Sequence, residues 1–420
     1  IREYAFERLI ESGEMPRVRR LHAEFFLQFA RDVEPHIRTS ERARWRSILQ
    51  QDLENIRGVL NWALTRSEGL EAGQSLTFAL TFFWALCGVM SEGLDYCRRF
   101  LDLTNETTPL PVRAGLLTLA GAISMLQGRD AHSNTDWQED IPLARQSGEK
   151  QVLANALLVG GARALAGNDP VLAAERLEEC ELLFRELGDE WGESVSVLWQ
   201  RNSALLRGDP QRAAQLFDRG LSLARHQGDP WLLVVPLSNV AQDAFAKGEL
   251  EKAESTLLEL VSTMRTTADL WTVGWPLTAL AQIQLQRGQL DSARVYISEA
   301  LQVGGEQGNV MAQTYSLAEA AALLVLCYAR EGTDQQLLQA KLLNAARLCG
   351  ASAAFVSSPH LLGSTLTKDV YDAMTAQVHR AVGAENWEKG YGEGTRMPLE
   401  QAVELATSEL KQAAGGNLVQ

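Results

Sequence analysis

Hydrophobic positions recur with helical spacing through most of the chain. Between residues 229 and 268 they form two successive stretches, Leu237, Val240, Ala241, Ala244 and Phe245, then Ala253, Leu257, Leu260, Val261 and Met264. Steps of three and four residues place such side chains on one face of an α-helix, whereas a half-buried strand alternates every second residue. The pattern therefore predicts paired amphipathic helices.

Two sets of turn signals divide these helices into units of about 40 residues. The first set, each followed by a polar residue, is Gly148, Gly188, Gly228, Ala268 and Gly308. The second set lies between them, at Gly128, Gly167, Gly208, Gly248 and Gly288. Glycine adopts the left-handed backbone that ends a helix, and an Asp or Asn after it caps the next helix. Hairpins that cannot bury their apolar faces alone must stack on their neighbours, so the spacing predicts an all-α solenoid.

The units resemble tetratricopeptide repeats (TPR) in the placement of small residues. One unit has Ala281, Gly288, Ala293 and Ala300 where that family packs its two helices closely. The preceding unit matches more loosely, with Leu260 at the last of the four positions, and the unit is longer than the family's roughly 34 residues. The resemblance implies TPR-like helical hairpins whose first helices line a concave face.

Three further stretches resemble the C-terminal half of bacterial STAND-type regulatory ATPases, the NB-ARC-containing relatives of LuxR-type and antibiotic-regulator activators. They are residues 1–9, residues 51–62, and a tail that runs from Leu348 through Glu385 to Leu399. No G-x-x-x-x-G-K-S/T loop occurs in the sequence, so we expect no phosphate-binding loop of that type. The resemblance implies four parts: a helical linker from an ATPase or winged-helix module at residues 1–66, a divergent helical pair at 67–109, a repeat array at 110–350 and a helical cap at 351–420.

The same resemblance implies a regulatory sensor rather than an enzyme. Its concave face would bind an effector, which is a peptide, a protein or a small molecule, and control the upstream ATPase or a transcriptional output of the same polypeptide. One alternative is a constitutive assembly scaffold, which would show no ligand-induced change across residues 189–325. A remote alternative is an enzyme whose site uses His360, Asp369 or His379 of the C-terminal cap. The open edges of a solenoid would also allow a homodimer.

One helical stripe on the first helix of each unit is the candidate ligand surface. Its tryptophans recur every 40 residues and predict a ladder, beside a parallel row of amides. Aromatic anchors next to amides are typical of peptide and small-molecule sites, and amides are costly to bury without partners, which favours a solvated groove. The alternative is that the tryptophans are packing residues between stacked helices, and both interpretations are open. The stripe consists of Trp191, Asn202, Trp231, Ser238, Gln242, Trp271, Trp275, Thr278, Gln282 and Tyr315.

Two prolines, Pro236 and Pro276, occupy equivalent positions in neighbouring units. Proline is tolerated in the first turn of a helix but removes a hydrogen bond from its interior. We expect these helices to begin near Leu233 and Val273, which would place each proline in a first turn. The alternative is a pair of stacked kinks that shape the groove.

The charge distribution argues against a nucleic-acid surface. The net charge is −14, and residues 1–70 hold twelve arginines against eleven acids, so the acidity lies in the repeats and the cap. Phosphate binding needs clustered basic residues, and we expect no direct nucleic-acid partner. The acids Glu178, Glu179 and Glu181 are expected on a solvated helix face. Two arginine clusters either meet an acidic face of the ATPase module or lie on a solvated face: Arg17, Arg19 and Arg20, and Arg42, Arg44 and Arg46.

No pattern of catalytic or metal-binding residues stands out. The six histidines form no HExxH motif, so we expect no metal, no cofactor and no catalytic set. The longest apolar stretch, residues 76–90, is shorter than the roughly 20 residues of a membrane span, so no membrane partner is expected. The scattered cysteines suit reduced thiols in a cytoplasmic protein. They are Cys87, Cys97, Cys180, Cys327 and Cys349.

Overall fold

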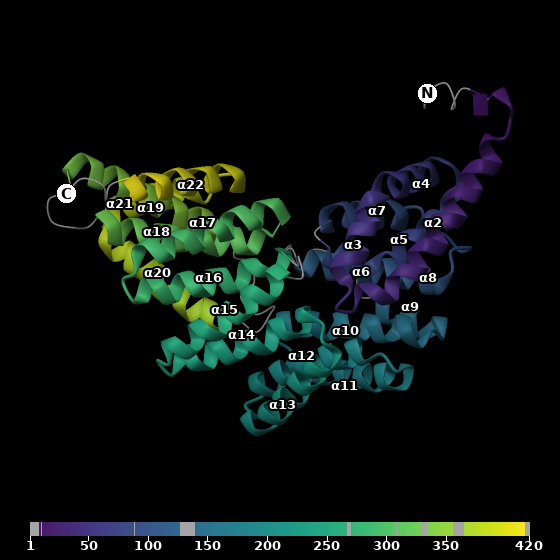
Figure 1. Cartoon of the computed structure of the whole chain (residues 1–420), viewed down its shortest axis with the longest axis horizontal. Coiled ribbons are helices and arrows are strands. Elements are labelled where there is room, and N and C mark those ends of the chain that lie inside the picture. Colours follow the sequence, from purple (N-terminus) through teal and green to yellow (C-terminus); the bar gives the residue numbers. More distant parts are fainter. Residues whose placement is uncertain are drawn as a thin grey trace.

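The chain is all-α in the residues that the computed structural model describes. These are residues 8–9, 11–87, 89–126, 139–266, 270–307, 309–328, 334–355 and 365–415, and none of them lies in a strand. The fold class predicted from hydrophobic spacing is confirmed. The helices form an N-terminal group, a series of antiparallel hairpins and a C-terminal group (Figure 1).

The N-terminal group consists of short helices around a long first one. They are α2 (Met15–Ile37), α3 (Arg42–Gln51), α4 (Leu53–Thr65), the 3-10 turn η1 (Ser67–Gly69), α5 (Leu70–Ala79), α6 (Thr81–Leu86) and α7 (Met90–Leu101). Their apolar side chains share one core with Trp191, Val195 and Leu232 of the hairpin array. The N-terminal helices are therefore packed against the array rather than extended away from it.

The hairpins follow one another along the chain with helices of similar length, except for the short α9. They are built from α8 (Leu110–Leu126), α9 (Asp140–Ser147), α10 (Lys150–Ala166), α11 (Pro170–Leu187), α12 (Glu190–Leu206), α13 (Pro210–Gln227), α14 (Pro230–Ala246), α15 (Leu250–Thr266), α16 (Leu270–Gln286), α17 (Leu290–Gln307), α18 (Val310–Tyr328) and α19 (Gln335–Phe355). Figure 1 shows them running from the N-terminal group through α10–α13 to the C-terminal group on the opposite side.

The C-terminal group packs on the last hairpin through a second core. It consists of α20 (Thr365–Val382), α21 (Ala384–Gly394) and α22 (Leu399–Gly415). Leu323 of α18, Val378 of α20 and Ala406 of α22 are among its fully buried members. The expected boundary between array and cap, at residues 350 and 351, lies inside α19.

The turns between hairpins have the geometry that the sequence predicts. Gly148, Gly188 and Gly228 have φ angles of 74°, 68° and 68°, in the left-handed region that ends a helix. The Asp189 and Asp229 carboxylates then accept backbone N–H groups of the next first turn. Gly128, Ala268 and Gly308 lie outside the described residues.

The turn within one hairpin differs from this pattern. Gly167 has an ordinary φ of −78°, and Asn168 takes the left-handed conformation with φ 59°. Asparagine tolerates that region better than other side-chain-bearing residues, so the turn shifts by one position without a glycine.

The two prolines lie inside helices, so the expected helix starts are wrong. α14 begins at Pro230 and α16 at Leu270, several residues before Pro236 and Pro276. In α14 the reason is local, because Asp229 caps the helix and Pro230 fills its first position, where a missing N–H costs nothing.

Candidate functional site

The first two tryptophans of the predicted ladder lie in contact. Trp191 and Trp231, in the first turns of α12 and α14, stack with ring centroids 5.3 Å apart and planes at 26°. Trp191 is buried, and its Nε1 donates to Oδ2 of Asp229 at 3.0 Å. Equivalent side chains of successive hairpins thus line up as predicted at this point. The Trp271 side chain lies outside the described residues.

Side chains from the N-terminal group cover this tryptophan pair. Phe82 of α6 contacts Trp191 edge to face at 5.4 Å. The Arg38 guanidinium, just after α2, lies over the Phe82 ring at 4.7 Å and over Trp191 at 6.0 Å. A cation over an aromatic face gains stabilisation from the ring quadrupole, and more when the contact is desolvated. This end of the stripe is therefore occupied by the chain itself.

Two ion pairs fix the N-terminal group on successive hairpins. Arg38 pairs with Asp189, the cap of α12, and also contacts Glu34 at 3.1 Å. Arg42 Nη2 lies 2.5 Å from Oδ2 of Asp229, the cap of α14, and its Nε donates to the Ile37 carbonyl at 2.8 Å. The Asp229 side chain has no exposed surface. Each aspartate therefore caps a helix and holds an arginine of the N-terminal group at the same time.

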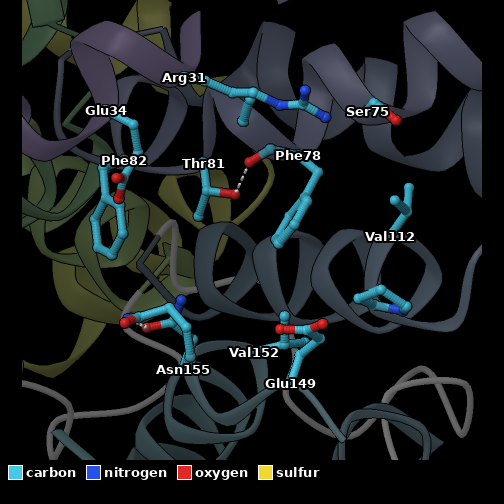
Figure 2. A pocket seen from close by; sticks show the side chains of 13 residues that line it. Arg31, Glu34, Ser75, Phe78, Thr81, Phe82, Val112, Glu149, Val152 and Asn155 are labelled. Carbon is cyan, nitrogen blue, oxygen red and sulfur yellow. Dashed lines mark hydrogen bonds between the residues drawn. The ribbon is translucent and has the colours of Figure 1, made fainter. Parts of the chain in front are cut away.

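A cavity of about 420 Å³ adjoins the Arg38 contact (Figure 2). It lies between α2, the α5–α6 turn, the start of α8 and the start of α10. Its volume is within the range of small-molecule sites, roughly 300–1,000 Å³. Burial raises the pKa of Glu34, and the nearby Arg38 opposes that rise. The lining residues include Arg31, Glu34, Phe78, Phe82, Val112, Glu149, Gln151, Val152 and Asn155.

The far end of the predicted stripe is covered by the C-terminal group. Tyr315 of α18 is only 4% exposed and meets Tyr371 of α20 edge to face at 6.0 Å. Burial raises the pKa of Tyr371 to about 12. The stripe therefore has segments of the same chain packed over both of its ends.

The amide row is not solvated throughout, contrary to the expectation from the sequence. Gln282 is 4% exposed, and its Nε2 donates to Oε1 of Glu319 at 3.1 Å. Glu319 has no exposed surface, and burial raises its pKa well above the usual range. Thr278 is also buried, and its hydroxyl donates to the Trp275 carbonyl at 2.8 Å. Partners within the protein thus replace water for this part of the stripe.

The middle of the stripe is more open. Asn202 is half-buried and accepts a hydrogen bond from Arg201 at 3.4 Å. Ser238, Gln242 and Trp275 are half-buried as well. Together with Trp231, which is also half-buried, they are the described part of the predicted surface that keeps contact with solvent.

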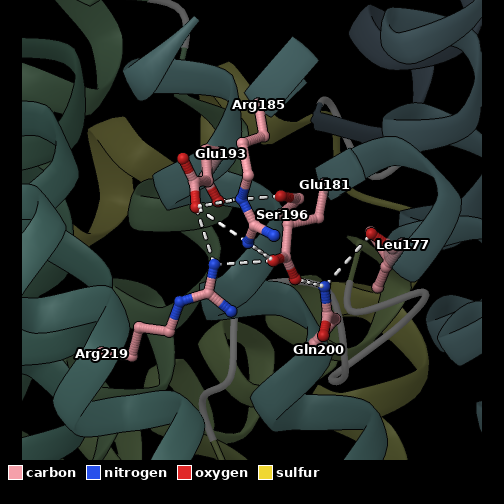
Figure 3. A network of polar contacts seen from close by, with 7 residues as sticks. All are labelled: Leu177, Glu181, Arg185, Glu193, Ser196, Gln200 and Arg219. Carbon is pink, nitrogen blue, oxygen red and sulfur yellow. Dashed lines mark hydrogen bonds and ion pairs between the residues drawn. The ribbon is translucent and has the colours of Figure 1, made fainter. Parts of the chain in front are cut away.

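A polar network on α11, α12 and α13 holds the hairpins together (Figure 3). Arg219 contacts Glu181 at 2.6 Å and Glu193 at 2.7 Å, and Gln200 Nε2 donates to Glu181 at 2.7 Å. Burial works against ionisation of Glu181, but the bonds from Arg219 and Gln200 outweigh it and lower its pKa. Glu181 is 7% exposed, so the expectation of a solvated face was wrong for this carboxylate.

Sequence reasoning did not identify the arginines and aspartates that anchor the N-terminal group. Arg42 belongs to a cluster that we expected to face another module or solvent, and it meets Asp229 of this chain instead. Asp189 and Asp229 were assigned only as helix caps. The available signal was the coincidence of an arginine-rich segment with aspartates repeated every 40 residues in an otherwise acidic array.

The described residues show little other candidate chemistry. No group of three or more His, Cys, Asp or Glu in these ranges is placed to hold a metal ion. His379 lies against Trp387 with ring centroids 4.6 Å apart, while His360 and Asp369 fall outside the described side chains. The cysteines are free thiols, and burial raises the pKa of Cys349 to about 12. Across the described helices, none has both the length and the hydrophobicity that crossing a membrane requires.

Comparison with known proteins identifies the fold but no family. No family model and no curated protein sequence matches the chain. A Rap protein solved in complex with Competence and Sporulation Factor is similar in structure, with a TM-score of 0.51 and 12% identity over 90% of this chain and 99% of that one. At this identity the likeness shows the arrangement of helical hairpins alone.

Two further solved structures are similar to this chain over most of its length. The quorum sensor NprR from B. thuringiensis has a TM-score of 0.42 and 15% identity over 84% of this chain and 98% of that one. A STAND protein with a tetratricopeptide repeat sensor, from Pyrococcus horikoshii, has a TM-score of 0.45 and 12% identity over 88% of this chain and 55% of that one. The chain thus spans about half the length of that STAND protein. By its fold, it is an all-α protein built of TPR-like helical hairpins.

Proposed function

We propose that this chain is a regulatory sensor that binds an effector on the concave side of its hairpin array. The effector is a peptide or a protein, with a small molecule as the alternative, and its binding controls an adjoining STAND-type ATPase or transcriptional output. The free cysteine thiols suit the reducing conditions of the cytoplasm. The fold resembles a Rap protein that was crystallised with Competence and Sporulation Factor, which supports an effector-binding role.

One observation carries this proposal: the N-terminal group is anchored on two successive hairpins at once. Arg38 and Arg42 lie four residues apart and reach Asp189 and Asp229, which belong to different hairpins. In a solenoid each hairpin contacts only its neighbours, so an effector between hairpins alters their spacing locally. A change in that spacing strains or breaks one of the two ion pairs. The position of the N-terminal group then depends on what the array has bound.

Peptides selected from a random library by binding to the native chain would test this coupling. We expect bound peptides to increase hydrogen exchange in α2 and α3, because they disturb the anchoring ion pairs. Binding should weaken in Gln242→Ala and persist in the control Gln377→Ala, which changes an exposed amide on α20 outside the stripe. The scaffold alternative predicts binding with unchanged exchange in α2 and α3, and that result would contradict a sensor.

A further inference from the structure

The cavity beside Arg38 has unpaired charges of opposite sign on opposite walls. Arg31 projects from α2, and Glu149 precedes α10 on the other side (Figure 2). Within the described part of the chain neither side chain has an ion-pair partner, and the Glu149 carboxylate makes no capping bond to its helix. The charges are therefore free to meet groups of a ligand.

Apolar and amide side chains lie between these charges. Phe78 and Phe82 form one wall, and Val112 and Val152 line the space as well. Amide groups are supplied from α10 by Gln151 and Asn155. A small-molecule site commonly combines a mostly apolar lining with a few polar groups that fix orientation.

We propose that this cavity binds a short peptide with two free ends and an apolar side chain between them. The peptide carboxylate lies at Arg31, the ammonium group at Glu149 and the apolar side chain against Phe78 and Phe82. The N-terminus of α10 beside Glu149 carries about half a positive charge, whereas the Glu149 carboxylate carries a full negative charge. This end of the cavity therefore favours the ammonium group of the peptide over its carboxylate. The assignment rests on the proposed sensor function and adds a second site to it, because none of the stripe residues lines this cavity.

Two lining residues connect the cavity to the anchoring contacts. Gln151 Nε2 donates to Oδ2 of Asp189 at 3.3 Å, and Glu34 lies 3.1 Å from Arg38. A peptide that engages Gln151 or Glu34 competes with the Arg38–Asp189 pair for the same groups. Occupation of the cavity therefore weakens a contact that anchors the N-terminal group.

Calorimetric titration with the tripeptide Ala-Phe-Ala tests the assignment. The free-ended peptide should bind the native chain, and N-acetylation or C-amidation should each weaken binding about tenfold, the effect of losing one charge-assisted hydrogen bond. In Arg31→Gln, the free peptide should bind no more tightly than the C-amidated one but still more tightly than the N-acetylated one. In Glu149→Gln, the free peptide should bind no more tightly than the N-acetylated one but still more tightly than the C-amidated one. Both residues are exposed, so neither change should disturb folding.

Matched controls are available on exposed faces away from the cavity. Arg20→Gln, also on α2, and Glu178→Gln, on α11, should leave all affinities unchanged. Equal binding of free and blocked peptides, or no binding of the free peptide at millimolar concentration, would overturn the proposal. Equal affinity for L-phenylalanine would overturn the peptide assignment in favour of a free amino acid. In any of these cases, library-selected peptides that still loosen α2 and α3 would leave the sensor function standing.

Discussion

The two ends of the candidate stripe are covered by the same chain but through different chemistry. At the N-terminal end, Trp191 lies under the Arg38 guanidinium, and ion pairs to Asp189 and Asp229 hold the cover in place. At the C-terminal end, Tyr315 lies under α20 in a core of apolar side chains. The N-terminal cover combines an apolar core with buried charged contacts, whereas apolar contacts hold α20 over Tyr315.

This difference indicates which cover a ligand can displace. Apolar burial is proportional to area and has no specific geometry, so a ligand would have to replace a whole helix face of α20 to release it. A buried ion pair offsets the desolvation of its own charges and adds little net stability, although the loss of one partner is costly. A ligand that supplies new partners to the charges can therefore loosen the ion pairs of the N-terminal cover without replacing its apolar core. Under the proposed sensor function, the N-terminal end is therefore the end at which we expect a ligand to act.

The largest effect is expected from Arg42→Ala. The change leaves Asp229, which has no exposed surface, without its arginine, and an unpaired buried charge costs roughly 3–5 kcal/mol of unfolding free energy. Urea unfolding should show this loss, with increased hydrogen exchange in α2, α3 and the first turn of α14. The control is Arg44→Ala, which removes a side chain that is 69% exposed and should have almost no effect. Equal losses of unfolding free energy in the two variants would contradict the assignment of Arg42 as a specific anchor.

A somewhat smaller effect is expected from Met374→Ala in α20. Met374 is 8% exposed, and truncation of a buried methionine costs roughly 2–5 kcal/mol, with the lower half of that range fitting its partial exposure. Exchange should increase in α18 and α20 while α2 and α3 stay protected. Gln377→Ala, which changes an exposed residue on the same helix, should alter neither the unfolding free energy nor the hydrogen exchange. A loss of protection that spread to α2 would show that the two covers are not independent.

The local parts of this structure could be predicted from the sequence. Gly188 followed by Asp189 contains its own helix stop and helix cap, and the 40-residue spacing then places Trp191 next to Trp231. The pairing of Arg38 with Asp189 joins residues 151 positions apart. Helical periodicity tells which face of a segment is buried, but it contains no information about where an N-terminal segment folds back.

The buried amide of Gln282 shows a second limit. The prediction of a solvated row rested on the cost of burying an amide without a partner, and Glu319, 37 residues later, supplies that partner. The signal for it was a carboxylate inside an otherwise apolar run from Leu317 to Val325. Such a residue is expensive unless it is paired or neutral, so its presence indicated a buried polar contact between hairpins.

A still smaller, pH-dependent effect is expected from Glu319→Gln. Burial raises the pKa of Glu319, so the native state is penalised as pH rises above the ordinary glutamate value and free of this penalty below it. The uncharged variant should match the native chain in acid and exceed it at neutral pH, by about 1.4 kcal/mol for each unit of the pKa shift. Its amide can also donate to Gln282 Oε1, which has no partner among the described atoms.

Unfolding free energies measured between pH 4 and pH 8 would test this prediction. The matched control is Glu404→Gln, which changes an exposed carboxylate on α22 and whose curve should run parallel to that of the native chain. A constant difference between Glu319→Gln and the native chain at all pH values would contradict a titrating buried carboxyl. The result bears on the comparison of the two ends of the stripe. It measures the cost of burying the Glu319 carboxyl, which has no countercharge among the described residues, whereas the buried Asp229 has Arg42.

The smallest effect is expected from Arg145→Ala. Arg145 makes two hydrogen bonds to Glu179, of 2.7 and 2.9 Å, which is the geometry of a well-formed bidentate ion pair. The two side chains are 55% and 39% exposed, however, and exposed pairs contribute only about 0–1 kcal/mol because water and salt screen them. Urea unfolding should therefore detect a loss well below that of Arg42→Ala, and added salt should reduce it further. If the two losses were equal, ion pairing alone would set the strength of these contacts, and burial would no longer distinguish the N-terminal anchor from an ordinary surface pair.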